Sequence, residues 1–125
     1  MHRLLPAVAA LAVSAASASA QAVTVHLAEW KLTLSRDTVA AGPVTFRVTN
    51  DGTMTHGFFV RGPGVAKGAR DLNKDESATL TVTLKPGTYE LYCPLADGTH
   101  RTAGMSKQIV VVAASGSASA RKPGA

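Results

Sequence analysis

The sequence has little of several residue types that mark common classes of protein. Only one of its 125 residues is a cysteine, and 5% are aromatic. A single cysteine excludes an internal disulfide. The 13 basic residues outnumber the 8 acidic ones, but they are scattered singly and form no basic run interleaved with aromatics, which argues against nucleic-acid binding. No carboxylate pair or nucleophile elbow is visible, so we expect no enzymatic activity.

Long hydrophobic runs are also absent, apart from a short one near the N-terminus. A basic start, an apolar core over residues 4–13 and the ending Ala18-Ser19-Ala20 are typical of an export signal. The apolar core is about half of the ~20 residues that a spanning helix needs, so we expect no stable membrane insertion. We predict cleavage after Ala20, with Ala22 as a second possibility, and a periplasmic location. Because no cysteine lies nearby, a lipid anchor is not expected.

The rest of the chain has room for one small domain. Residues 114–125 are small and polar and have no periodicity, as in a flexible tail. The segment between the two ends is long enough for a single hydrophobic core, and it contains no internal repeat. We therefore predict a signal peptide at residues 1–20, one folded domain at residues 21–113 and a flexible tail at residues 114–125.

The alternation of apolar and polar residues predicts an all-β domain. It is clear over residues 44–49 and 78–84, where the apolar side chains fall on one face. Residues 109–112 form a further apolar strand near the end of the domain. No segment has a sustained helical period. Many short strands with glycine and proline turns between them indicate a sandwich or a barrel.

Three local features are expected within this domain. The turn at residues 86–87 should join the strand before it to residues 88–93 as a hairpin. The alternation slips by one residue near residues 28–29, which predicts a bulge in a continuous strand and places Trp30 in the core. Residues 62–75 are expected to be irregular.

The most informative stretch brings the only cysteine, Cys93, together with His100 and Met105 in one loop at the end of a strand. A further histidine, His56, follows a turn upstream. Two imidazoles, one thiolate and one thioether are the ligand set of a blue-copper electron-transfer site. A bound metal would also occupy a lone thiol that is otherwise a liability in an oxidising compartment. We predict one copper ion, cycling between Cu(I) and Cu(II), at these four residues.

Each of these residues also has an ordinary interpretation. Cys93 could be a core residue, the two histidines could be surface groups, and Met105 could fill a gap in the core. Met54 is a weaker rival ligand close to His56. His26 falls on the polar face of its strand and is expected to be exposed to solvent. Zinc could use the same ligands, but it gains little from a thioether.

The chain resembles the small cupredoxins, the group that includes plastocyanin, azurin and sulfocyanin. The likeness covers residues 23–112 and rests on three motifs. These are Asn-x-Gly…His-x-Phe at residues 50–58, Lys-Pro-Gly-Thr-Tyr at residues 85–89, and Tyr-Cys…His…Ala-Gly-Met at residues 92–105. The resemblance implies a Greek-key β-sandwich or barrel, a monomer, and copper ligation by His56, Cys93, His100 and Met105.

Two departures from the family pattern concern the ligand loop. Six residues separate Cys93 from His100, more than the family usually has, and the extra length could expose the metal or shift the site from blue toward green. Gly57 stands where some members have Asn or Ser beside the first histidine. Only the backbone N–H of Gly57 is then available to restrain the thiolate.

The ligand set and the resemblance together predict an exported type 1 copper protein that carries single electrons between redox partners, such as a cytochrome or a copper oxidase. The edge of His100 is the expected exit for the electron. The residues expected to form an apolar patch around it are Pro94, Leu95, Ala96 and Met105. Arg61 and Arg101 are expected to steer an acidic partner.

The alternative to an electron carrier is a periplasmic copper carrier or buffer that delivers the metal to another protein, as an open ligand loop would allow. A copper enzyme is less favoured. After removal of the signal peptide only His26, His56 and His100 remain, too few for a trinuclear oxidase cluster, and one cysteine is too few for a binuclear centre.

Overall fold

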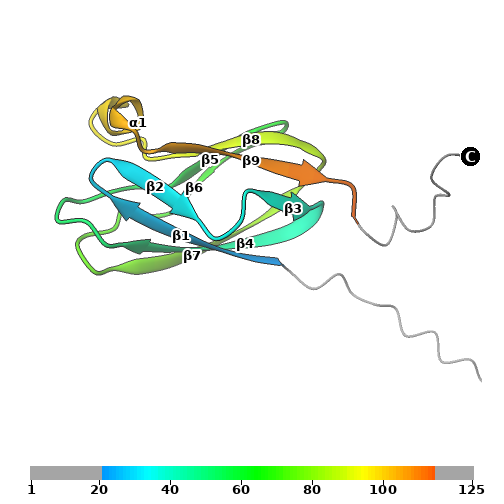
Figure 1. Cartoon of the computed structure of the whole chain (residues 1–125), viewed down its shortest axis with the longest axis horizontal. Coiled ribbons are helices and arrows are strands. Elements are labelled where there is room, and N and C mark those ends of the chain that lie inside the picture. The colour runs from blue at the N-terminus through cyan, green and yellow to red at the C-terminus, as the bar shows by residue number, and fades with distance from the viewer. Residues whose placement is uncertain (1–20, 115–125) are drawn as a thin grey trace, which may run out of the picture.

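The computed structural model describes residues 21–114, which form nine strands and one short helix. The expected signal peptide and the expected tail beyond Ala114 lie outside the described residues. The strands form two sheets that lie face to face (Figure 1). The first sheet has the order β2 (Lys31–Leu34), β1 (Gln21–Ala28), β4 (Gly42–Asn50) and β7 (Ser77–Leu84). The second has the order β3 (Thr38–Ala40), β9 (Ser106–Val112), β8 (Gly87–Tyr92), β5 (Phe59–Gly62) and β6 (Val65–Gly68).

Both sheets mix parallel and antiparallel pairs. β1 runs parallel to β4, and β3 runs parallel to β9, whereas the remaining neighbours are antiparallel. Parallel neighbours cannot be joined by a tight hairpin. In this fold the chain passes through the opposite sheet before it returns to the parallel partner. The all-β sandwich that the alternation predicts is confirmed.

The core lies between the sheets and follows the alternation of the strands. Val44, Phe46 and Val48 of β4 are all buried, while Arg47 between them is exposed. Phe46 packs against Phe58 of the opposite layer, with ring centroids 5.3 Å apart. Full burial of one such side chain stabilises the fold by about 1.5–3 kcal/mol. This buried layer holds the two sheets together, and the loops extend from the ends of its strands.

The slip near residues 28–29 is a turn and not a bulge. Ala28 of β1 pairs with Lys31 of β2, so only Glu29 and Trp30 remain between two antiparallel strands. A tight turn reverses the chain, and the apolar face resumes on a new strand, which looks like a slip in the sequence. Trp30 lies at the tip of this turn and is 43% exposed, so its predicted place in the core is wrong.

The hairpin predicted at residues 86–87 is also wrong, because β7 and β8 belong to different sheets. The turn carries the chain from one layer to the other, and the hydroxyl of Tyr89 donates to the carbonyl of Lys85 at 2.7 Å across it. Within the segment expected to be irregular, residues 65–68 form β6, which pairs with β5. Local alternation identifies a strand, but its partner depends on which layer buries its apolar face.

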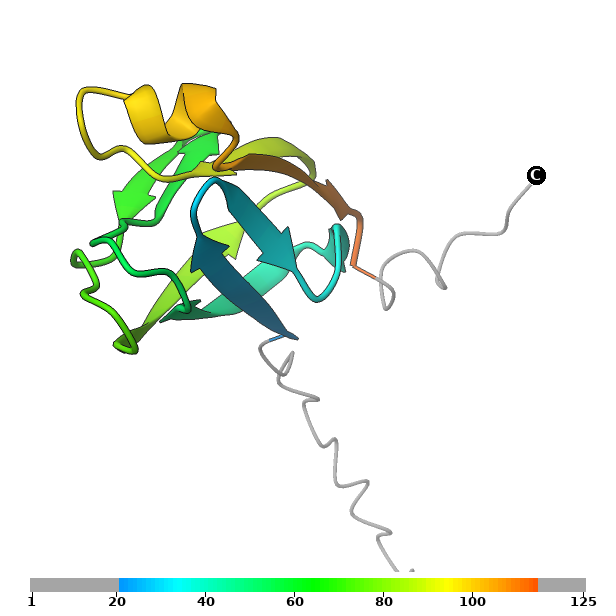
Figure 2. The same cartoon turned by 60° about the vertical axis from the view of Figure 1, so that its left-hand side comes forward.

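The loops that carry the predicted ligands gather at one end of the sandwich. The short helix α1 (Thr99–Ala103) lies there, and the turned view shows the tip of the β1–β2 hairpin close to it (Figure 2). Within residues 21–114, no helix has both the length and the apolar character needed to span a membrane.

Candidate metal centre

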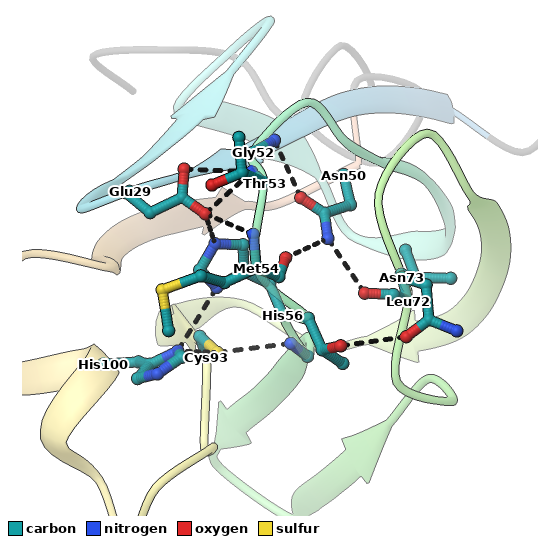
Figure 3. Close-up of polar contacts among 12 residues, drawn as sticks. Glu29, Asn50, Gly52, Thr53, Met54, His56, Leu72, Asn73, Cys93 and His100 are labelled. Atoms are coloured by element: carbon teal, nitrogen blue, oxygen red, sulfur yellow. Dashed lines mark hydrogen bonds and ion pairs between the residues drawn. The ribbon is translucent and has the colours of Figure 1, made fainter.

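Three of the four predicted ligands meet in a compact cluster. His56, Cys93 and His100 each offer one ligand atom, and these atoms all lie within 4.8 Å of one another. The Nδ1 atoms of the two histidines are 3.2 Å apart, and the Cys93 Sγ is 3.6 Å from the His100 Nδ1 (Figure 3). His56 and Cys93 are completely buried, and His100 is only 7% exposed. Two imidazole nitrogens and one thiol therefore converge at a site closed to solvent.

The fourth predicted ligand, Met105, is tied to the same loop by its backbone. Its carbonyl accepts a hydrogen bond from the Cys93 N–H at 3.1 Å, and its N–H donates to the His100 carbonyl at 3.1 Å. Its side chain is fully buried. Met105 therefore cannot belong to an exposed patch around His100, and that part of the predicted patch is wrong.

The segment that carries His56 is held on both sides. His56 exchanges two backbone hydrogen bonds with Leu72, of 3.0 and 2.8 Å. Upstream, the buried side chain of Asn50 donates to the carbonyls of Met54 and Leu72 at 2.7 and 2.9 Å, and accepts from the Gly52 N–H at 2.9 Å. Both the NH2 group and the oxygen of the Asn50 side chain therefore form hydrogen bonds that hold the turn, which explains the Asn-x-Gly motif before the histidine.

The thiol of Cys93 has a donor at the place that the sequence predicts. The backbone N–H of Gly57 points to the Cys93 Sγ at 3.2 Å. A side chain at this position would be crowded, since a Cβ on Gly57 would lie 3.0 Å from the Asp71 Oδ1 and 3.2 Å from the Pro94 Cδ. Glycine thus lets the neighbouring chain approach closely enough for the backbone to reach the sulfur.

The long connection between Cys93 and His100 folds back on the domain. It ends in α1, which carries His100 in its first turn. The residue before this helix is Gly98, whose φ is 84°. Arg101 anchors this helix to β8, because its Nε donates to the Glu90 Oε2 at 2.7 Å. The Arg101 guanidinium also lies 4.6 Å from the ring centroid of Tyr92. The extra loop length therefore builds a helical turn that presses His100 into the site.

The ion pair beneath α1 shifts the acid–base behaviour of Glu90. Partial burial alone would raise the pKa of the Glu90 carboxyl, but hydrogen bonds from Arg101 and Ser106 and the positive charges of Arg101 and Arg61 lower it below its usual range. Arg101 is consequently neutralised in part by Glu90, whereas Arg61 remains exposed. Of the two arginines predicted to steer a partner, Arg61 is the more available.

Two residues of the β1–β2 turn belong to the centre although the motifs did not point to them. The Glu29 Oε1 lies 3.0 Å from the His56 Nε2. The ring of Trp30 lies edge-on to both imidazoles, with centroids 4.9 Å from His100 and 6.2 Å from His56. The turn is 27 residues before His56 in the sequence, so no local spacing connects them.

The carboxylate of Glu29 is unusually acidic. Its pKa falls from 4.5 to about 2, chiefly because the backbone N–H of Met54 donates to it. Desolvation opposes the shift, while hydrogen bonds from its own backbone, from His56 and from Thr53 add to it. Glu29 therefore places a full negative charge beside His56 at neutral pH.

The two remaining candidates, His26 and Met54, are exposed to solvent. His26 is exposed as predicted, and its Nδ1 lies 2.5 Å from the carboxylate of Asp51. The rival ligand Met54 is 44% exposed, and its backbone N–H donates to Glu29. Neither residue shares the enclosure of His56, Cys93 and His100.

Comparison with known proteins agrees with this architecture. Residues 3–105 match the family model described as a cupredoxin-like domain. The chain belongs to the cupredoxin-like family. No curated protein matches this cupredoxin significantly. Its β-sandwich is the cupredoxin fold that the sequence predicts.

Two solved structures illustrate the likeness of fold. One is dithionite-reduced auracyanin from the photosynthetic bacterium Roseiflexus castenholzii, with a TM-score of 0.60 and 18% identity over 74% of this chain and 98% of that one. The other is a chain from a haem-copper terminal oxidase dimer, with a TM-score of 0.55 and 17% identity over 75% of this chain and 66% of that one. The fold thus resembles nearly the whole auracyanin chain and about two thirds of the chain from the oxidase structure.

The donor atoms of this cupredoxin suit a copper ion. Thiolate and imidazole donors are those that copper prefers, and a weak thioether completes its usual set. The two Nδ1 atoms face each other in a buried space, an arrangement that a cation between them would stabilise. The cluster can therefore hold a metal, and the family makes copper the fitting one.

Proposed function

We propose that this cupredoxin is a type 1 copper protein that carries single electrons between redox partners. In this proposal His56, Cys93 and His100 bind the metal strongly, and Met105 is the weak axial ligand. The observation that carries it is the convergence of two imidazoles and one thiol in a buried cluster. Copper held there would supply a one-electron couple between Cu(I) and Cu(II).

The chain itself keeps the ligands still. The backbone pair with Leu72 holds His56, and the N–H of Gly57 holds the sulfur of Cys93. The ion pair between Arg101 and Glu90 holds the helical turn of His100. Ligands fixed in this way need little rearrangement when the charge of the site changes, and this favours rapid electron exchange.

Burial favours the electron carrier over the copper carrier. An acceptor protein that takes copper must reach the ion with its own ligands, but His56 and Cys93 are closed to solvent and Trp30 lies against His100. His100, with the partly exposed Trp30 beside it, is the proposed exit for the electron. No reaction of its own is proposed for the chain.

The setting of the protein is also part of the proposal. We propose export to the periplasm, action as a monomer, and a redox protein such as a cytochrome or a copper oxidase as partner. The excess of basic over acidic residues, which remains after loss of Arg3 with the signal peptide, supports an acidic docking surface on that partner. If charge steers the encounter, the rate of electron transfer should fall as the ionic strength rises.

The decisive experiment is a visible and electron-paramagnetic-resonance spectrum of residues 21–125 after addition of Cu(II), with a Cys93→Ser variant as control. We expect an intense thiolate-to-copper band that the variant lacks. Competition with a strong chelator then separates the two functions, because an electron carrier should retain its copper and a delivery protein should release it. Absence of the band in the wild-type protein would overturn the type 1 assignment.

A further inference from the structure

We propose that Glu29 is a positioning residue for the metal centre, which selects the tautomer of His56 and favours Cu(II) over Cu(I). The inference about copper rests on the proposed function, whereas the inference about the tautomer concerns the protein without metal. Glu29 reaches the site from the β1–β2 turn, outside the two loops that carry the ligand motifs.

The geometry around His56 separates its two ring nitrogens. The Nε2 lies 3.0 Å from the Glu29 Oε1, and the Nδ1 faces the cluster, 3.2 Å from the His100 Nδ1 (Figure 3). An ionised carboxylate can only accept a hydrogen bond. The proton of neutral His56 must therefore sit on Nε2, which leaves the lone pair of Nδ1 free to bind a metal.

The carboxylate is itself held by the segment that leads to His56. Its oxygens accept from the backbone N–H of Thr53 at 2.9 Å and from that of Met54 at 2.7 Å. Gly52 makes room for it, because a Cβ at that position would come within 2.6 Å of the Glu29 Oε1. Glu29 thus joins the β1–β2 turn to the histidine segment with several contacts, and its distance to the imidazole is fixed.

The charge of Glu29 should also influence the metal. A carboxylate that accepts the N–H of a metal-bound imidazole makes that imidazole a stronger electron donor, and loss of such a partner typically changes metal affinity 10–100-fold. The more highly charged Cu(II) benefits more than Cu(I). Glu29 is therefore expected to lower the reduction potential of the site.

The test compares Glu29→Gln with wild type and with Asp37→Asn, which removes an exposed negative charge that has no contact with the cluster. The first readout is the tautomer of His56 in the metal-free protein, measured by nitrogen-15 chemical shifts. We expect wild type and Asp37→Asn to hold the proton on Nε2, and Glu29→Gln to give a mixture of tautomers. A His56 tautomer that is unchanged in Glu29→Gln would overturn the proposal.

The second readout is the reduction potential of the copper-loaded protein. We expect Glu29→Gln to weaken the preference for Cu(II) over Cu(I) about tenfold, a rise of about 59 mV for a one-electron couple. Asp37→Asn should leave the potential nearly unchanged, and an equal rise in both variants would refute a specific role. If no copper binds to wild type, the proposed function fails, while the tautomer measurement still tests Glu29. Glu29→Asp supplies a charged variant if Glu29→Gln does not fold, and it should retain the Nε2 proton.

Discussion

Replacement of Asn50 by alanine is expected to destabilise the domain more than any other change of one polar side chain near the metal centre. Asn50 is completely buried and makes three hydrogen bonds, two as a donor and one as an acceptor. Each such bond contributes about 1 kcal/mol net, and a buried partner left unpaired costs more. The expected loss of unfolding free energy is therefore about 3 kcal/mol.

The assay is thermal unfolding of the metal-free protein, followed by circular dichroism. A loss of about 3 kcal/mol corresponds to a fall in Tm of roughly 12–24 °C for a domain of this size. The matched control is Asn73→Ala, because Asn73 is exposed and its side chain accepts only one hydrogen bond, from the Thr55 hydroxyl at 2.9 Å. That variant should lose less than about 1 kcal/mol. Equal losses in the two variants would refute the argument that burial makes Asn50 important.

Two further predictions concern the cover of the site and the anchor of α1. Cu(II) is expected to quench most of the fluorescence of Trp30, the only tryptophan, because the centroid of the Trp30 ring lies 4.9 Å from that of the His100 ring. Zn²⁺, which has no redox chemistry, should quench little. Full colour with undiminished emission would contradict this placement. Glu90→Gln should cost no more than about 1 kcal/mol at neutral pH, since Arg101 and Glu90 are partly exposed. Because the pKa of Glu90 is lowered in the folded protein, the stability that wild type gains over Glu90→Gln is fully present above pH 4.5. It is lost as the pH falls through the lowered pKa of the folded state. Denaturant titrations of both proteins at several pH values would show this loss.

The strands could be predicted from the sequence to the extent that their signals are local. In β4 the apolar residues alternate with polar ones and are buried as expected: Val44, Phe46 and Val48. This alternation can be read from the sequence because successive side chains of a strand point to opposite faces of the sheet. The pairing of β7 and β8 could not be predicted in this way. Both flank a proline–glycine turn, but each finds its partner in a different sheet, and that choice depends on the packing of the whole domain.

The candidate site shows the same division. His56, Cys93 and His100 could be named from residue types and spacing, and the structure brings them together. The sequence did not identify Glu29 and Trp30 as part of the site, since a glutamate and a tryptophan in a turn form no motif that indicates metal binding. They reach the site only because β1 lies beside β4, whose end leads to His56. The surroundings of the candidate site are thus a product of the tertiary fold.

That dependence on tertiary structure makes the centre a reporter of folding. β1 opens the described domain and lies in parallel beside β4, while β9 closes it beside β3 and β8. Contacts so distant along the chain form slowly, and the cluster has no complete set of donors until both sheets are in place. Metal that binds only the assembled state then adds to stability by mass action, in proportion to the logarithm of its concentration. If copper binds as proposed, the appearance of colour after refolding would therefore time the assembly of the two sheets around the cluster.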